Sequence, residues 1–139
     1  MFSGEISIFA TERMNIEMVK DLLIVGMGSF IGGAARYLVS FLTKTVPNGF
    51  PWATFSVNII DCLLIGLLWG WSNRCPNIPQ QLSLFLSVGI CGGFTTFSTF
   101  SKESLALLQS GCYLQFALYV IGSVIIGILA VALGLMLTK

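Results

Sequence analysis

The chain contains 139 residues, of which 55% are hydrophobic and only 9% are charged, and its formal net charge is +1. A soluble domain carries about 25% charged residues, so this composition excludes an ordinary soluble protein and predicts one embedded in a lipid bilayer. The sequence has no histidine, no phosphate-binding loop, no nucleophile elbow and no basic patch, which argues against an enzyme and against a partner that is a nucleic acid.

Residues 1–21 are predicted to form an N-terminal extension on the cytoplasmic side. The segment is mixed in charge and weakly apolar, and its four acidic residues without a small-residue cleavage site argue against a signal peptide. Met14 and Met18 are alternative starts, so the length of the extension depends on where translation begins. Residues 22–139 then form one transmembrane domain.

Four apolar segments of that domain are long enough to cross a bilayer, which requires about 20 residues each. Short polar connections that contain proline or glycine join them. The sequence therefore predicts an all-α membrane protein with four transmembrane helices, over residues 22–42, 53–72, 82–108 and 113–137.

The first span offers a packing surface and one cation. Gly28 and Gly32 form a pair of small residues four positions apart, which lets helix backbones approach closely in a membrane. Arg36 follows near the end of the span, where it either extends to the aqueous interface or attracts anions at a vestibule. The spacing alone favours the interfacial role.

Three polar residues of the second span, Thr54, Asn58 and Asp61, lie on one helical face. Polar side chains at this depth face the interior of a bundle. The Asn58 amide can donate hydrogen bonds to an anion, or it can hold two helices together. An ionised Asp61 would repel an anion, so we expect it to pair with a donor, to be protonated or to lie off the pathway.

The third span has the most unusual sequence. Gly89, Gly92 and Gly93 each cost a helix about 1 kcal/mol relative to alanine, and together they predict a break in the middle of the membrane. Irregular backbone at that depth is tolerated where protein buries it or where it lines a cavity, and its freed carbonyls suit a cation such as sodium.

Aromatic and hydroxyl residues follow the predicted break. Phe94, Phe97 and Phe100 recur at every third position and share a helical face, with threonines and serines around them. Phenyl edges carry partial positive charge, so edge-on rings and hydroxyl donors can hold a small anion without a fixed charge. The alternative is a packed phenylalanine stripe whose neighbouring hydroxyls bond back to the helix. The whole cluster beside three glycines favours the site.

The fourth span carries no charge. Tyr119, Ser123 and Gly127 form a weakly polar stripe along one face of it. Packing is the default role of such a stripe, and pathway lining is the alternative.

The basic residues are divided almost evenly between the two sides of the predicted bundle. Four lie on the side of the termini and three lie toward the other side: Arg13, Lys20, Arg74 and Lys139 against Arg36, Lys44 and Lys102. The positive-inside rule then fixes the orientation only weakly. The balance fits one weakly fixed topology, or insertion in both orientations to give an antiparallel homodimer, which would be equivalent to an inverted repeat.

Three of these segments together resemble a known family, the bacterial fluoride channels known as Fluc or CrcB proteins. The matching motifs are residues 32–37 (GGAARY), 54–58 (TFSVN) and 89–101 (GICGGFTTFSTFS), in the order and spacing of the family. Glu103 matches a family carboxylate near the vestibule. The resemblance covers residues 18–139, and the third motif is long and unusual.

The resemblance implies an antiparallel, dual-topology homodimer of four-helix subunits in the bacterial inner membrane, with two fluoride pores. It implies that Phe97 and Phe100 contact fluoride with their rings and that Asn58 donates a hydrogen bond to it. A structural sodium ion would lie at the dimer centre. The other implied residues are Thr99, Tyr119 and Ser123 in the polar lining, Arg36 and Glu103 at the vestibule, and the Gly92 and Thr95 carbonyls as sodium ligands.

By this resemblance the chain would export fluoride passively and protect the cell from its toxicity. The sequence departs from the family pattern at Asp61, where a small residue is usual, and in the length of its N-terminal extension. One rival interpretation is a small dual-topology, proton-coupled multidrug exporter, for which Asp61 is the only deep carboxylate candidate. A second is a membrane subunit or assembly factor without transport activity.

Overall fold

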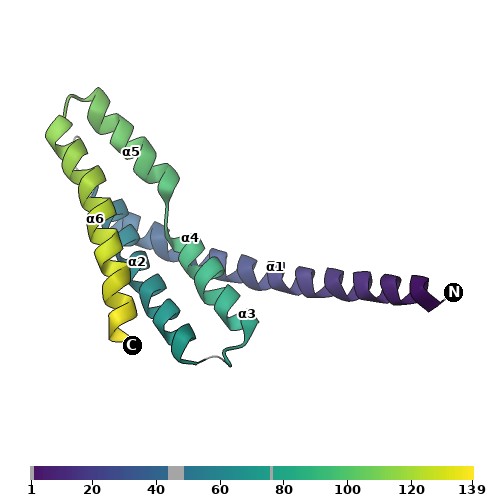
Figure 1. The fold of residues 1–139 in the computed structure, drawn as a ribbon. Coiled ribbons are helices and arrows are strands. Elements are labelled where there is room, and N and C mark those ends of the chain that lie inside the picture. Colours follow the sequence, from purple (N-terminus) through teal and green to yellow (C-terminus); the bar gives the residue numbers. More distant parts are fainter. Residues whose placement is uncertain (1, 44–48, 76) are drawn as a thin grey trace.

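The structure is a computed structural model that describes residues 2–43, 49–75 and 77–139, with side chains from Arg13 onward. Regular structure in these residues is helical throughout (Figure 1). The helices are α1 (Phe2–Leu42), α2 (Trp52–Arg74), α3 (Gln80–Ser83), the π-helix η1 (Leu84–Cys91), α4 (Gly92–Phe94), α5 (Phe97–Gln109) and α6 (Tyr113–Leu137). Lys44, which entered the charge balance, lies outside the described residues.

Four helical stretches are long and apolar enough to cross a membrane, as the sequence predicts. They are Arg13–Leu42, Trp52–Arg74, Gln80–Gln109 and Tyr113–Leu137. The third of them comprises α3, η1, α4 and α5 in succession. The prediction of an all-helical chain with four apolar stretches long enough to span a membrane is confirmed for the described residues.

The N-terminal extension is helical and continuous with the first span. Residues 2–21 belong to α1 without interruption, and this part of α1 projects as a rod beyond the other helices (Figure 1). The stretch contains three glutamates, three isoleucines and two methionines but no proline, so no proline ends the helix there.

The four spans pack in two pairs, and the two spans of each pair run in the same direction. α1 packs on η1 and α4, and α2 packs on α6. Backbone meets backbone where glycines face one another: a Cβ added at Gly28 would lie 2.7 Å from the Cα of Gly89, and one added at Gly134 would lie 2.5 Å from the Leu63 carbonyl. Small residues therefore set the helix spacing in both pairs.

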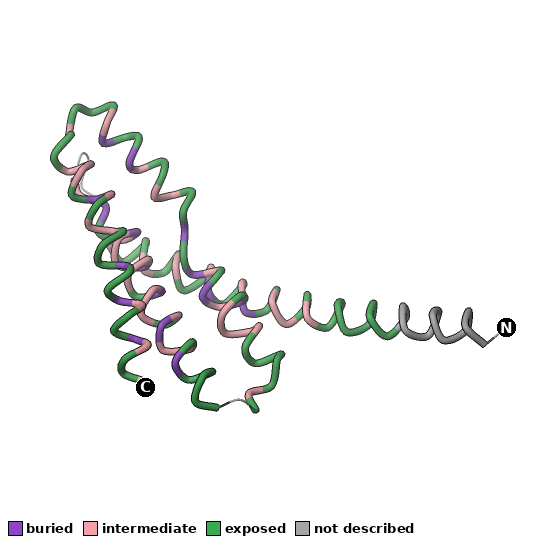
Figure 2. The backbone as a smooth tube through the Cα atoms, viewed as in Figure 1, coloured by how far each residue is buried: buried purple, intermediate pink, exposed green. Residues whose placement is uncertain are grey.

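The buried interior is small and the outer surface is apolar. Val57 and Tyr119 are fully buried, whereas Phe30, Phe41 and Leu114 are each more than 70% exposed. Figure 2 shows few buried positions, and the other described positions of each helix are intermediate or exposed. An exposed apolar surface of this extent fits a protein whose surroundings are lipid or other membrane helices.

The third span is interrupted after Phe94. Thr95 (ψ 157°) and Thr96 (φ −151°, ψ 112°) are extended, and they form the thin link between α4 and α5 in Figure 1. Gly89, Gly92 and Gly93 stay helical, so the break lies later in the sequence than predicted. The reason is packing, because a Cβ at Gly93 would lie 2.6 Å from the Ser29 carbonyl; two of the three glycines, Gly89 and Gly93, are used for contact with α1.

Candidate functional site

Asn58 on α2 pairs with the extended link of the third span. Its Oδ1 accepts hydrogen bonds from the Thr96 amide (3.1 Å) and the Thr95 hydroxyl (3.0 Å), and its Nδ2 donates to the Thr96 carbonyl (3.4 Å). In a continuous helix, the Thr96 amide would instead bond to the Gly92 carbonyl. Asn58 therefore supplies hydrogen-bond partners for the backbone of Thr96 where the helix is broken. The Gly92 carbonyl then lacks the Thr96 amide as a partner.

Thr96 ends the link and begins α5. Its side-chain oxygen accepts a hydrogen bond from the Thr99 amide at 3.3 Å, which makes it the N-cap of α5. Its hydroxyl also donates to the Thr99 hydroxyl at 3.0 Å. From the sequence, Thr96 was only one of the hydroxyl residues around the phenylalanines. A threonine directly before a helix is an N-cap signal, and this signal could have predicted its role.

A cavity of about 190 Å³ lies beside the break. The rings of Phe97 and Phe100 have centroids 5.9 Å apart, and Phe97 is 79% exposed. The cavity is lined by Asn58, Thr95, Thr96, Phe97, Phe100, Ser123 and Val124. None of these side chains carries a formal charge, so the cavity can offer an anion only amide, hydroxyl and ring-edge dipoles.

Ser123 brings an unused hydroxyl to that cavity. Its Oγ is buried and has no hydrogen-bond partner among the residues that the structure describes. A buried hydroxyl without a partner loses free energy that a ligand or a water molecule can restore. The family resemblance implies that Asn58, Phe97, Phe100 and Ser123 belong to one site, and the structure brings these four residues together at one cavity.

A second cavity, of about 260 Å³, also borders on Thr96. It contains Arg36 and Thr99 of the predicted residues, so Thr99 is separated from the cavity with the two rings. Its full lining is Gly33, Arg36, Tyr37, Ser40, Thr54, Val57, Thr96 and Thr99. Its one charged group is the Arg36 guanidinium, which fits an entrance that attracts anions.

Glu103 connects three helices. Its Oε1 accepts from the Thr54 hydroxyl at 3.0 Å, and its Oε2 accepts from the Tyr119 hydroxyl at 2.8 Å. Tyr119 is fully buried, and its ring packs against that of Phe100 with centroids 4.9 Å apart. Tyr119 lines neither cavity, so it reaches the site through Phe100 and Glu103 rather than by facing it.

Two predicted groupings are changed by the fold. Phe94 does not share a face with Phe97 and Phe100, because the break between them interrupts the helical phase; Phe94 is buried and lies outside both cavities. Asp61 is also buried, its Oδ1 has no partner among the described residues, and it lines neither cavity. Of the three expectations for Asp61, the structure supports a place away from the two cavities.

A cation site near the break would draw on carbonyl, amide or hydroxyl oxygens rather than on a cluster of acidic side chains. The described residues contain no cluster of three or more His, Cys, Asp or Glu side chains that could hold a metal ion. Gly92 and Thr95 are both exposed in the single chain.

Comparison with known proteins gives a consistent result over most of the chain. A family model described as CrcB-like protein, Camphor Resistance (CrcB), matches residues 23–135. The Fluoride-specific ion channel FluC of Phocaeicola vulgatus is 46% identical over 122 residues, which cover 87% of this chain and 100% of that protein.

Two further relatives carry the same name. The Fluoride-specific ion channel FluC of Prosthecochloris aestuarii is 41% identical over 123 residues, covering 88% of this chain and 96% of the relative. The protein of that name from Methylobacterium sp. (strain 4-46) is 46% identical over 114 residues, covering 82% of this chain and 92% of the relative. The match to the family model, over residues 23–135, includes the residues that line both cavities and the break.

Proposed function

Because the chain belongs to the CrcB-like family, we propose that it is a fluoride-specific ion channel that exports fluoride passively and so lowers its toxic intracellular concentration. Relatives more than 40% identical over most of their length are named fluoride-specific ion channels. An ion channel is not an enzyme, and the chain needs no catalytic constellation for this role.

The observation that carries the proposal is the uncharged cavity beside the break. It is lined by Asn58 and Ser123 together with Phe97 and Phe100. Fluoride is small and strongly hydrated, so the main barrier to its passage is the loss of water. Neutral donors replace that water and still release the ion, which conduction requires, whereas a buried lysine would hold it too tightly.

Fluoride efflux from liposomes that contain only this protein tests the proposal. Vesicles loaded with potassium fluoride or potassium chloride are diluted into salt-free buffer, and efflux is started with a potassium ionophore. We expect fast release of fluoride and background release of chloride. Equal release of both ions, or release of neither, would contradict the proposal.

The proton-coupled exporter is not favoured by the site. Such an exporter needs a carboxylate that drug and proton share. Asp61 lines neither of the two cavities, and Glu103 is engaged by the hydroxyls of Thr54 and Tyr119. The relatives are named ion channels, which agrees with this geometry.

The functional unit that we propose is an antiparallel homodimer of chains inserted in both orientations. The near balance of basic residues supports it. So does the exposure of the site, because Phe97 is 79% exposed and Thr95 is also exposed in one chain. A partner chain would cover these groups and complete the pathway.

A structural sodium ion at the dimer centre is part of the same proposal, held by the Gly92 and Thr95 carbonyls of both chains. Its support is the hydrogen bond from the Thr96 amide to Asn58, which withdraws the usual helical partner of the Gly92 carbonyl. Freed backbone carbonyls at a helix break are suited to sodium.

The expected location is the inner membrane of a bacterium. The four candidate spans support a multi-pass membrane protein, and the organisms of the named relatives are bacterial. Residues 22–139 would form the channel domain, with residues 1–21 as an extension of its first helix.

A further inference from the structure

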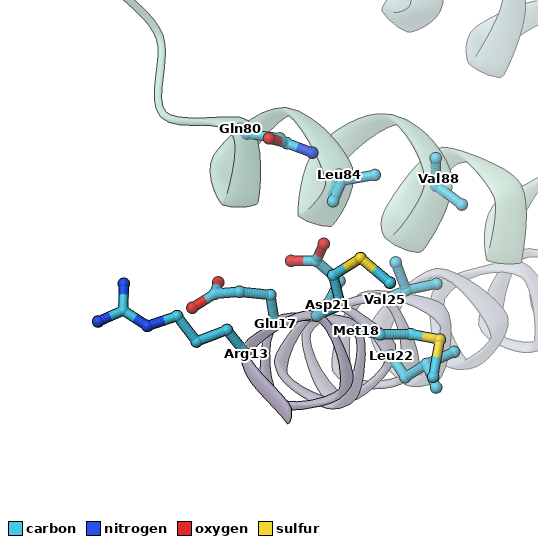
Figure 3. A pocket seen from close by; sticks show the side chains of 10 residues that line it. Arg13, Glu17, Met18, Asp21, Leu22, Val25, Gln80, Leu84 and Val88 are labelled. Atoms are coloured by element: carbon cyan, nitrogen blue, oxygen red, sulfur yellow. The ribbon is translucent and has the colours of Figure 1, made fainter. Parts of the chain in front are cut away.

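A groove of about 690 Å³ lies between α1 and the start of the third span. Figure 3 shows Gln80, Leu84 and Val88 on one side of it and residues of α1 on the other. The groove shares no lining residue with either of the two cavities beside the break. It is therefore separate from the proposed fluoride pathway.

The two cavities beside the break, in contrast, meet at one residue. The second cavity contains the Arg36 guanidinium, whereas the cavity with the two rings contains no formal charge. Thr96 lines both cavities, and it is the one described residue that they share. Thr96 is buried, with 6% of its surface exposed. An anion that Arg36 attracts and that moves on to the rings therefore passes Thr96.

The backbone of Thr96 is held in place by Asn58. The side-chain amide of Asn58 accepts a hydrogen bond from the Thr96 amide at 3.1 Å and donates one to the Thr96 carbonyl at 3.4 Å. The backbone N–H of Thr96 is therefore occupied, and it cannot turn toward an ion without losing this bond. The donor of Thr96 that remains for an ion is its hydroxyl group.

The hydrogen bond between the hydroxyls of Thr96 and Thr99 can reverse its direction. The Thr96 oxygen accepts from the Thr99 amide at 3.3 Å and lies 3.0 Å from the Thr99 hydroxyl. Each hydroxyl has one hydrogen, which rotates to suit the partners present, and two lone pairs. While Thr96 donates, the hydrogen of Thr99 is free for an ion in the second cavity, which Thr99 lines. While Thr99 donates, the hydrogen of Thr96 is free for an ion beside the rings.

We propose that the Thr96 hydroxyl passes fluoride between the two cavities, as a donor whose hydrogen bond with Thr99 reverses when the ion crosses. This role rests on the proposed function, because it is a step between the charged entrance and the rings. Only the two hydroxyl hydrogens change direction. The Thr96 oxygen accepts from the Thr99 amide in both arrangements, so it caps α5 while the ion passes.

Fluoride efflux from liposomes that contain full-length Thr96 variants tests this step. Thr96→Asp and Thr96→Asn have nearly the same shape, and both keep an oxygen that caps α5. Asparagine also has N–H donors, whereas an ionised aspartate has none and repels an anion. At neutral pH, we expect efflux from Thr96→Asp to be lower than that from Thr96→Asn by a factor of about ten or more. The same rate in both variants would overturn the proposal.

Two further variants control for charge and for the hydroxyl group. Gln109→Glu places a negative charge on the same helix, at an exposed position outside both cavities, and should leave efflux unchanged. Thr96→Ser keeps both the hydroxyl and the cap and should retain most of the wild-type efflux. The proposal fails if Gln109→Glu conducts as poorly as Thr96→Asp, or if a folded Thr96→Ser does not conduct.

Thermal melting of the purified variants separates conduction from folding. Thr96→Asp and Thr96→Asn should melt alike, because both cap α5. If Thr96→Asp does not fold, Thr96→Val decides instead: it keeps the shape without a hydroxyl, so its efflux should be about tenfold lower than that of Thr96→Ser, and matching rates would refute the role of Thr96. A wild-type protein that conducts no fluoride would refute the channel itself, whereas a conducting wild type with an unaffected Thr96→Asp would refute only the step at Thr96.

Discussion

Asn58 has a double role at the scale of single residues. Three hydrogen bonds tie its amide to Thr95 and Thr96, and one N–H of Nδ2 remains for an ion in the adjoining cavity. The two interpretations that the sequence left open, interhelical contact and anion donor, are therefore compatible. The contacts are those of the structure, and donation to fluoride stays a prediction.

Replacing Asn58 with aspartate should block conduction. Asn58→Asp keeps the acceptor for the Thr96 amide but removes both donors and places a negative charge where fluoride passes, so fluoride efflux should fall by a factor of about ten or more. Asn73→Asp makes the same chemical change at an exposed position near the end of α2 and should leave efflux unchanged. Equal efflux from the two variants would show that Asn58 does not lie on the fluoride pathway.

The N-cap hydrogen bond of Thr96 should contribute to the free energy of unfolding about as much as a typical helix cap. Thr96→Val preserves the shape of the side chain and removes the oxygen that accepts from the Thr99 amide, so the free energy of unfolding should fall by about 1 kcal/mol. Thr96→Ser retains the cap and should stay close to the wild type. Denaturant titration followed by circular dichroism measures the difference, and an unaffected Thr96→Val would show that the cap is not needed.

At the scale of helices, the glycines matter through packing. A Cβ at Gly28 would meet the Gly89 Cα at 2.7 Å, whereas one at Gly26 would have nothing within 4 Å. Helix propensity alone would make alanine favourable at both positions by about 1 kcal/mol. The two positions therefore separate packing from propensity within one helix.

Gly28→Ala should lower the thermal midpoint of the purified protein, because α1 and η1 cannot separate without losing their contact. Gly26→Ala should leave the midpoint unchanged or raise it. Fluorescence-monitored melting in detergent measures both. If the two variants melt alike, the close approach of α1 and η1 does not contribute to stability.

The sequence was sufficient for the helices and insufficient for the break. Apolar runs and short polar connections predicted all four spans. The ends of three of these spans were predicted to within a few residues. The glycines predicted a break. The structure instead places two of them at the contact of η1 and α4 with α1, and the sequence does not show which helix lies opposite them. The separation of Phe94 from Phe97 depends in turn on where the break falls. The resemblance implied that Tyr119 belongs to the polar lining, and a one-helix pattern cannot show that its hydroxyl donates to Glu103.

At the scale of the whole molecule, dual topology predicts that the C-terminus appears on both sides of the membrane. Lys139→Cys is introduced after replacement of the native cysteines, Cys62, Cys75, Cys91 and Cys112. An impermeant maleimide should label about half of the protein in intact cells, since the orientation bias is weak, and the remainder after permeabilisation. Labelling from one side alone would rule out the antiparallel dimer.

Sodium should stabilise the dimer if it lies at the break. Replacing sodium with N-methylglucamine should lower both the thermal midpoint and fluoride efflux, since an ion that binds the folded state alone adds stability in proportion to the logarithm of its concentration. Potassium at equal ionic strength controls for screening. Identical melting in the three salts would argue against a structural sodium ion.

Fluoride efflux from liposomes that contain phenylalanine variants tests most directly whether fluoride passes the rings beside the break. Phe97 and Phe100 line the uncharged cavity, whereas Phe94 is buried outside it. Phe97→Ile and Phe100→Ile keep apolar bulk and remove the ring edge, so efflux should fall by a factor of about ten or more while the protein still elutes as a single species. Phe94→Leu should retain most of the wild-type efflux. Wild-type rates in both isoleucine variants would show that the rings only pack, and would contradict the account.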